Sequence, residues 1–175
     1  MTHTSIPAGT HIGHVHLKVA DLERAVHFYQ DIMGFDLLMN MGTAAFLSAG
    51  GYHHHLGLNT WESLDGSPPA KGTTGMYHYA INYPTRRDLA VALVRILESG
   101  WGIDGASDHG THEALYMHDP DFNGMELAWD RAPEAWPRKD GQLVFSRKPL
   151  DFAGLLAELG EQAPTHFLES LAKYD

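Results

Sequence analysis

The chain repeats one pattern of roughly 25 residues, and a repeat of this length constrains the fold more than any other feature of the sequence. Residues 12–35 are echoed by residues 76–101. Each copy carries a histidine in a strand-like run, His14 in the first and His78 in the second. A turn and an amphipathic helix follow, and each helix ends in a glycine and an aromatic residue. The sequence therefore predicts two related units with a histidine at equivalent positions.

Composition excludes several classes of protein. At 175 residues the chain can bury a sizeable core, and its formal net charge of −10 argues against a nucleic-acid partner. The absence of cysteine excludes disulfides and thiolate metal sites. The sequence lacks the basic n-region and apolar stretch typical of a signal peptide, and no apolar run approaches the roughly 20 residues that span a bilayer. We expect a cytoplasmic protein that does not bind membranes. The count of 13 histidines needs an explanation.

The order of predicted elements is the same in both halves. The first half predicts a strand over residues 12–19, a helix between Asp21 and Gly34, and strands over residues 35–41, 44–49 and 52–59. The second predicts a strand over residues 76–83, a helix begun by Thr85 and Asp88, and a hairpin with one strand ending near His118 and the next beginning near Gly124. A Gly/Pro-rich linker, residues 61–74, separates two βαβββ units at about 11–60 and 75–130. We expect an α+β fold, followed by an extension over residues 131–175 with a short strand at 142–145 and two short helices.

The two repeated histidines and one carboxylate are candidate metal ligands. A lone histidine in a strand is more often a hydrogen-bonded core residue, but equivalent positions in a duplicated unit favour His14 and His78 as ligands. Glu126 lies on the strand face opposite Met125 and Leu127, and this face meets either solvent or a cleft. Two imidazoles and one carboxylate suit Fe(II), Mn(II) or Zn with open positions.

Other residues near this set have two interpretations each. The hairpin turn is centred near Asp121, so Tyr116 should lie opposite or nearly opposite Glu126. There it is either an ordinary cross-strand aromatic or a phenol that donates to a metal-bound oxygen. His109 and His112 lie in the preceding loop, as solvated surface residues or as acid–base groups.

Three consecutive histidines, residues 53–55, are predicted to begin a strand. Because strand side chains alternate, at most two of the three can face one cleft. Periodicity favours His53 and His55, opposite the face of Leu56 and Leu58. Periodicity does not settle which face is the cleft, because pockets for aromatic substrates are themselves apolar.

The strings GHVHLKVADLERAVHFYQDIMGF and DPDFNGMELAWDR resemble the vicinal oxygen chelate superfamily. This superfamily includes glyoxalase I, extradiol ring-cleaving dioxygenases, fosfomycin-resistance transferases and bleomycin-binding proteins. The strings GGYHHHLGLNTW, GMYHYAINYPTRRDLA and DHGTHEALYMHDPDFNGMELAWDR resemble bacterial catechol 2,3-dioxygenase-like proteins. The resemblance implies one glyoxalase/dioxygenase-like module over residues 10–130, with a cup-shaped mixed sheet.

The resemblance also implies roles for individual residues. It implies His14, His78 and Glu126 as metal ligands, Tyr116 as a contact of the metal-bound substrate or oxygen, and His109 as a catalytic residue. The family pattern His-x-x-small-apolar places the acid–base histidine at His54, against the periodicity. We expect the remaining histidines of this set, His16, His53, His55 and His112, to line the substrate pocket.

The implied function is a metal-dependent extradiol dioxygenase that acts on a catecholic aromatic substrate with O2, with Fe(II) as the expected metal and Mn(II) or Zn as alternatives. Another metalloenzyme of the superfamily, a glyoxalase-type isomerase or a thiol transferase, would use a fourth protein ligand from residues 52–59. A protein that only binds or sequesters a small molecule would need no metal. Typical relatives carry two modules and this sequence holds one. The resemblance therefore leaves open a site within one chain or across a strand-swapped homodimer.

Overall fold

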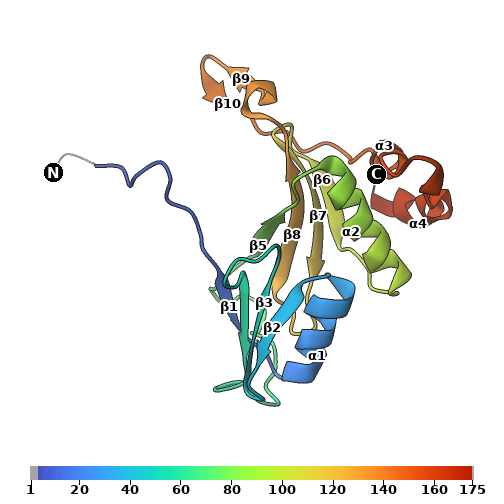
Figure 1. Ribbon diagram of the computed structural model, residues 1–175. Coiled ribbons are helices and arrows are strands. Elements are labelled where there is room, and N and C mark those ends of the chain that lie inside the picture. Colours follow the sequence, from blue (N-terminus) through green and yellow to red (C-terminus); the bar gives the residue numbers. More distant parts are fainter. Residues whose placement is uncertain (1–3, 175) are drawn as a thin grey trace. The chain divides into compact units, whose positions relative to one another are not determined.

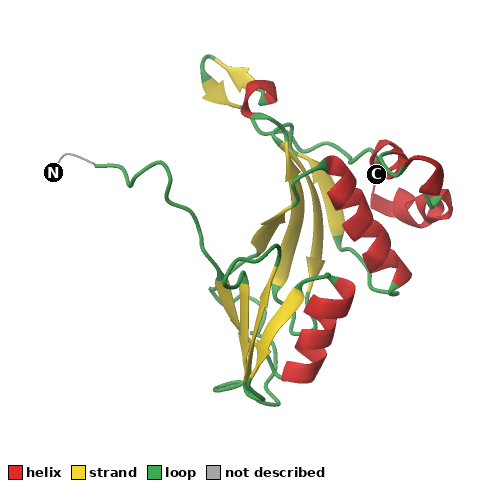
Figure 2. Ribbon diagram, in the orientation of Figure 1, coloured by secondary structure: helices red, strands yellow, loops and turns green. Residues whose placement is uncertain are grey.

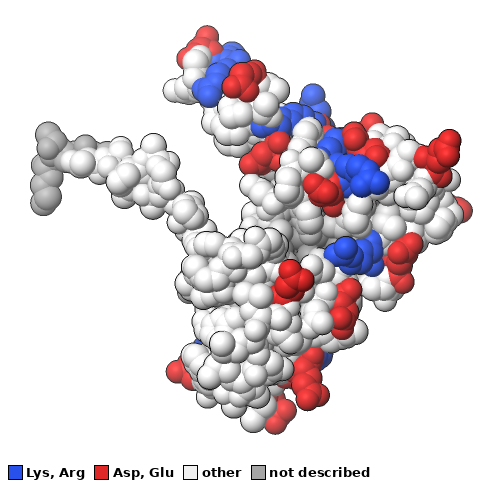
Figure 3. All heavy atoms as spheres, viewed as in Figure 1, with Lys and Arg blue, Asp and Glu red and all other residues white. Residues whose placement is uncertain are grey.

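A computed structural model describes residues 4–174 and divides the chain into two compact units, Met1–Ser67 and Pro68–Asp175. The division falls inside the linker predicted over residues 61–74. Among the described residues, none of the helices combines the length and the apolar character needed to cross a bilayer. Charged side chains of both signs are interspersed over the surface of the second unit (Figure 3).

The first unit is one four-stranded mixed sheet with a helix (Figure 1). Its elements are β1 (Val15–Lys18), α1 (Leu22–His27), which continues as a π-helical turn (Phe28–Ile32), β2 (Asp36–Asn40), β3 (Ala44–Ser48) and β4 (Leu56–Asn59). The strand order is β1-β4-β3-β2, with β1 parallel to β4 and the other pairs antiparallel. Helix α1 and its continuation bury Ala25, Phe28 and Tyr29.

The second unit repeats this topology. Its elements are β5 (Tyr79–Asn82), α2 (Arg86–Glu98), β6 (Gly105–Asp108), β7 (His112–His118) and β8 (Gly124–Asp130). The strand order is β5-β8-β7-β6, and β5 runs parallel to β8. The prediction of an α+β fold with a duplicated βαβββ unit is confirmed, and the duplication takes the form of two four-stranded mixed sheets.

The helix boundaries follow the capping signals in the sequence. The Asp21 carboxylate accepts the Arg24 N–H at 3.1 Å at the start of α1. Thr85 and Asp88 form a complete capping box at the start of α2, so aspartate serves here where glutamate is usual. Gly34 and Gly100 follow the helices with φ of 86° and 78°, a left-handed conformation that favours glycine.

One face of the second unit's sheet packs against α2 (Figure 2). Leu89, Leu93 and Ile96 of α2 are buried, and so are the apolar residues Leu115 and Leu127 of the central strands. Because side chains alternate along a strand, the opposite face of β7 and β8 presents His112, Tyr116 and Glu126. The helix therefore covers one face and leaves the other to functional side chains.

The C-terminal segment belongs to the second unit. It contains the strand pair β9 (Arg138–Lys139) and β10 (Gln142–Leu143), and the helices α3 (Phe152–Ala157) and α4 (Leu168–Leu171), joined by short 3-10 turns. Lys148 bridges to Asp108 of β6, and the Tyr174 hydroxyl donates to the Ile103 carbonyl. Leu155 and Leu156 are buried, so this segment adds to the core of the unit.

A half-buried network of ion pairs connects α2 and the end of α3 to the sheet. Glu113 of β7, whose side chain is 6% exposed, accepts Arg86 Nε at 2.8 Å and Arg131 Nη2 at 3.0 Å. Arg86 also reaches Glu158, and Arg131 forms a two-pronged pair with Asp108. Burial alone would raise the pKa of Asp108, but hydrogen bonds from Arg131 and from the Gly110 N–H hold that pKa below its usual range. The network is structural, and it lies on the helix face of β7.

Three strands begin later than the sequence predicts. His14 and His78 each come one residue before a strand, β1 and β5, rather than inside it. The histidine run, residues 53–55, lies in the turn before β4 and not in a strand, so the alternation argument for His53 and His55 was wrong. Gly50 and Gly51, with φ of 64° and 82°, start this turn.

Candidate metal centre

The candidate centre is built around the buried carboxylate of Glu126 on β8, which is 7% exposed. His78 Nε2 lies 2.8 Å from Glu126 Oε2, and His112 Nε2 lies 3.0 Å from Glu126 Oε1. Within residues 4–174, neither lysine nor arginine pairs with Glu126. Each oxygen of a buried carboxylate therefore faces an imidazole nitrogen, and not a fixed cation.

A glycine allows His78 to reach this position. β5 runs parallel to β8 with Ala80 opposite Glu126, so the residue before β5 lies near the start of β8. Gly124 begins β8, and a Cβ built there would lie 2.1 Å from the Tyr77 carbonyl oxygen. The backbone that carries His78 passes where any other side chain would stand.

Tyr116 lies directly opposite Glu126 on the neighbouring strand, as the hairpin symmetry predicts. Its hydroxyl is 2.7 Å from His109 Nε2 and 3.4 Å from Glu126 Oε1. Burial, followed by the negative charge of Glu126, raises the pKa of Tyr116 to about 12. The phenol therefore stays protonated over the physiological range and acts as a hydrogen-bond donor.

The tautomer of His109 follows from its second partner. His109 Nδ1 lies 2.9 Å from the Ser146 carbonyl oxygen, which can only accept, so Nδ1 carries a proton. In the neutral ring Nε2 then has a lone pair that accepts the Tyr116 hydroxyl. The hydrogen bond to Ser146 of the C-terminal segment thus orients the His109 ring so that Nε2 faces the Tyr116 hydroxyl.

Among the described residues, the group of three ligand atoms that lie close together differs from the triad implied by the resemblance. One ligand atom each of His109, His112 and Glu126 lies within 4.8 Å of the other two. Of the implied triad, the structure brings His78 and Glu126 together. His14 belongs to the first unit. His112 directly contacts the Glu126 carboxylate, a contact that the sequence did not indicate.

The first unit holds its own histidine cluster. The His14 ring lies 4.3 Å from that of His54, and His53 Nδ1 lies 2.9 Å from His54 Nδ1. Burial, followed by the nearby His14 and His53, lowers the pKa of His54. His16 packs between Phe46 and Trp61, with ring centroids at 5.9 and 5.6 Å.

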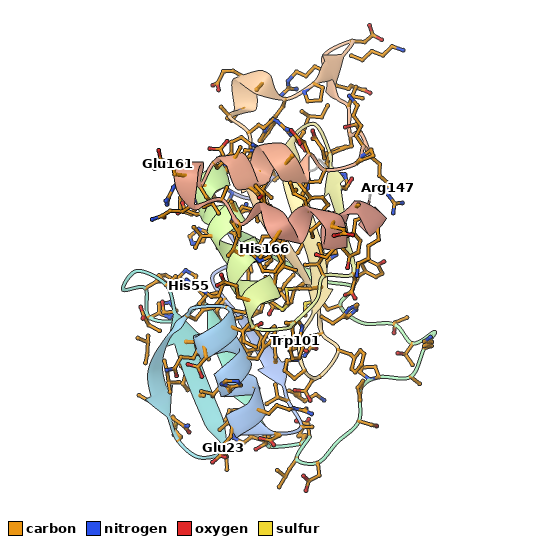
Figure 4. All side chains as sticks on the ribbon, turned by 90° about the vertical axis from the view of Figure 1, so that its right-hand side faces the viewer. Glu23, His55, Trp101, Arg147, Glu161 and His166 are labelled. Carbon is orange, nitrogen blue, oxygen red and sulfur yellow. The ribbon has the colours of Figure 1, made fainter. Side chains whose placement is uncertain are left out.

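His55 has a different environment and stabilises a turn. Its Nδ1 lies 3.2 Å from the Ala49 N–H and 3.1 Å from the Ser48 hydroxyl. Figure 4 labels this residue at the end of the first unit's sheet. One ring nitrogen of His55 is thus used to hold the chain between β3 and β4.

The two units differ at the position of the carboxylate. The strand registers make Gly57 of β4 the counterpart of Glu126, since Gly57 lies opposite His16 and Phe46 as Glu126 lies opposite Ala80 and Tyr116. A Cβ at Gly57 would lie 2.9 Å from the His16 ring. The imidazole of His16 thus occupies the space of a carboxylate, and only the second unit has an acidic ligand at this position.

A cavity of about 300 Å³ opens beside His78 and Tyr116 in the second unit. Its wall also includes Gly105, the ion pair of Asp104 and His118, and Arg147 of the C-terminal segment. Sequence reasoning missed all four of these residues. The sequence allowed the strand opposite Tyr116 to be placed, and this pairing was the one signal for the position of the cavity. The path of the C-terminal segment, which brings Arg147 to the wall, could not be predicted from the sequence.

The donor set fits a divalent transition metal. Neutral imidazoles with a carboxylate suit Fe(II), Mn(II) and Zn, and the chain has no cysteine to favour softer ions. A cation held by Glu126 and the facing imidazoles would supply the positive charge that this buried carboxylate otherwise lacks.

Comparison with known proteins shows the family to which the chain belongs. The Glyoxalase/Bleomycin resistance protein/Dioxygenase superfamily matches residues 11–127, so the chain belongs to this superfamily. Catechol-2,3-dioxygenase of Bacillus subtilis is 40% identical over 168 residues, which cover 93% of this chain and 56% of that protein. Biphenyl-2,3-diol 1,2-dioxygenase 3 of Rhodococcus globerulus is 27% identical over 126 residues, 68% of this chain and 63% of that one. The chain thus spans between half and two thirds of these relatives.

Solved structures agree on the fold. A glyoxalase/dioxygenase from Nostoc punctiforme matches 75% of this chain and all of that chain, with a TM-score of 0.60 and 23% identity. At this identity the likeness extends to the fold alone. The superfamily contains enzymes of several reactions and binding proteins, so the reaction has to be argued from the site.

Proposed function

We propose that this protein is a metal-dependent extradiol dioxygenase that opens the ring of a catecholic substrate with O2. One observation carries the proposal: a buried glutamate faces two imidazoles, with a protonated tyrosine directly opposite on the next strand. Such a set offers a mixed nitrogen and oxygen site beside a neutral hydrogen-bond donor. The names of the two curated relatives, both ring-diol dioxygenases, favour this reaction over the others in the superfamily.

The proposed metal ligands are His78 and Glu126 of the second unit and His14 of the first. Fe(II) is the proposed ion, with Mn(II) and Zn as alternatives. When bound, such an ion supplies Lewis acidity for the two vicinal substrate oxygens and, if redox-active, reactivity toward O2. The proposal further includes a single module over residues 10–130, an extension over residues 131–175, and a homodimer.

The protein's own residues have separate roles in this proposal. Tyr116 keeps its own proton, which it donates as a hydrogen bond to His109 Nε2 in the absence of substrate and would donate to a substrate oxygen in the complex. The Nε2 lone pair of His109 is then free, so this ring can accept a proton from the substrate. The pKa of His54 is lowered, first by burial, and the neutral ring can act as a base toward a catechol hydroxyl. His112 orients the Glu126 carboxylate, and His16 and His53 line the substrate pocket.

The test is a ring-cleavage assay on protein loaded anaerobically with Fe(II) and then mixed with oxygenated catechols. We expect a yellow ring-opened product and matching O2 consumption. The variant Glu126→Gln should bind little metal and form no product, and it serves as the matched control. Absence of product from every catechol, with metal bound, would contradict the proposal. Absence of any affinity for a transition metal would favour a small-molecule-binding protein.

A further inference from the structure

The cavity beside the candidate centre contains a guanidinium that the proposed reaction does not use. Arg147 lines the cavity together with His78 and Tyr116, and among the described residues of that wall it is the only lysine or arginine. Figure 4 shows this side chain reaching out from the C-terminal segment. The cavity volume of about 300 Å³ is in the range of small-ligand sites.

The backbone around Arg147 is held on both sides. Ser146 donates its N–H to the His109 carbonyl at 2.9 Å, and its own carbonyl accepts His109 Nδ1 at 2.9 Å. Lys148 exchanges two backbone hydrogen bonds with Asp108, at 2.9 and 3.1 Å. The segment thus lies along β6 and its following loop, and the same anchors that set the His109 tautomer fix the starting point of the Arg147 side chain.

The charge of Arg147 is available to a ligand. Within residues 4–174 this side chain has neither a hydrogen bond nor an ion pair, although Asp104 lies in the same wall. Asp104 is instead bound by His118, at 2.5 Å between Oδ2 and Nδ1. A cation without a protein partner, in a cavity that also contains His78 and Tyr116, is suited to an anionic group of the bound molecule.

We propose that Arg147 determines substrate specificity by binding a carboxylate on the ring substituent of the catechol. The inference rests on the proposed function and adds the substrate class, which is catechols with an anionic side chain. The planar guanidinium can hold a carboxylate with two parallel hydrogen bonds. Hydrogen bonds of this kind to a charged group correspond to roughly ten-fold or more in affinity.

The experiment compares two ligands of equal size, 3,4-dihydroxyphenylacetate and its neutral amide. Their dissociation constants are measured calorimetrically without oxygen on the metal-loaded wild type and on Arg147→Gln. The control is Arg138→Gln, because Arg138 lies in the same segment but outside the cavity wall, where it donates to the Gly141 carbonyl. We expect the wild type and the Arg138 variant to prefer the carboxylate by about ten-fold. Arg147→Gln should lose this preference, with affinity for the amide unchanged and the melting temperature unaltered.

Ring cleavage of the same two compounds separates this inference from the proposed function. If both are cleaved but the carboxylate is not preferred, or the preference survives Arg147→Gln, the role of Arg147 is overturned and the dioxygenase proposal stands. If neither is cleaved, binding of phenylacetate against phenylacetamide is compared. An Arg147-dependent preference there supports the anion site while the dioxygenase fails, and its absence overturns the anion site as well.

Discussion

The Tyr116 hydroxyl lies 3.4 Å from Oε1 of Glu126, the residue directly opposite it on β8. The same hydroxyl lies 2.7 Å from His109 Nε2. Burial and then the negative charge of Glu126 disfavour a phenolate and raise the pKa of Tyr116, so Tyr116 keeps its proton, with an imidazole and a carboxylate as its neighbouring acceptors. This is the arrangement expected of a donor that acts on bound substrate.

Removal of that donor should impair turnover but leave the metal site intact. Tyr116→Phe deletes one hydroxyl and keeps the ring, so Glu126, His78 and His112 retain their mutual contacts. We expect kcat for ring cleavage to fall by about 100-fold, the lower end of what a positioned proton donor contributes. Iron content per chain, measured by elemental analysis, should stay at the wild-type level. A variant with full kcat would show that Tyr116 is an ordinary cross-strand aromatic.

Metal content distinguishes two ligand sets that share Glu126. The proposed set uses His14 and His78, whereas the compact group in the second unit uses His109 and His112. We expect His14→Ala and His78→Ala each to lower transition-metal content at least about ten-fold, as loss of a direct ligand should. His112→Ala should retain the metal with weaker affinity. Loss of metal from His112→Ala but not from His14→Ala would favour the set within the second unit.

An exposed histidine provides the control for these substitutions. His166 lies in the 3-10 turn Thr165–Phe167 and is labelled in Figure 4 far along the C-terminal segment. His166→Ala should leave metal content unchanged. With 13 histidines in the chain, this control shows whether the measured metal is bound at one site or scattered over the surface.

Sequence patterns were sufficient for the order of elements in most of the repeat and for one contact of the site, but not for the strand order or for β6. The repeat predicted both βαβββ units, and hairpin symmetry predicted the Tyr116–Glu126 pairing, because both depend on local periodicity and turn position. The prediction of a strand at residues 53–55 was wrong. The residue types there are compatible with a strand, and the sequence did not show that the turn begun by Gly50 and Gly51 extends to residue 55. Arg147 could not be found, because its place beside Tyr116 depends on long-range hydrogen bonds of the C-terminal segment.

Gly124 should be required for both stability and metal binding. In Gly124→Ala the new methyl group would collide with the Tyr77 carbonyl, and the nearby His78 would shift. We expect a loss of about 1–3 kcal/mol in the free energy of unfolding, typical of overpacking, and weaker metal binding. The control Gly102→Ala adds a methyl group with nothing within 4 Å. Equal urea midpoints for the two variants would contradict the close approach.

Glu113 should contribute more to stability than Glu158, although both bind Arg86. The Glu113 side chain is 6% exposed and holds two arginines, whereas Glu158 is 40% exposed. Glu113→Gln removes the buried carboxylate that two half-buried guanidiniums share and leaves each with one acidic partner, Glu158 or Asp108, so we expect a loss of about 3 kcal/mol in the free energy of unfolding. Glu158→Gln should cost less than about 1 kcal/mol, as surface pairs do. Urea unfolding at constant salt checks both values, and similar losses would contradict a central role for Glu113.

Tyr83 should make the fold sensitive to alkaline pH. Burial raises the pKa of Tyr83 to about 12, from the usual value of 10.0. Below pH 10 the phenol is neutral in the folded and the unfolded chain, so pH has no effect through this group. Between pH 10 and 12 only the unfolded chain loses the proton, so stability falls with a limiting slope of about 1.4 kcal/mol per pH unit. Tyr116 titrates in the same direction and adds to the effect.

Tyr83→Phe should therefore remove part of the decline in stability, measured as urea midpoints at pH 9 and pH 11. Tyr77, which is 89% exposed, gives the matched variant Tyr77→Phe, and its decline should equal that of the wild type. An unchanged decline in Tyr83→Phe would mean that the half-buried phenol ionises as readily in the folded chain as in the unfolded one.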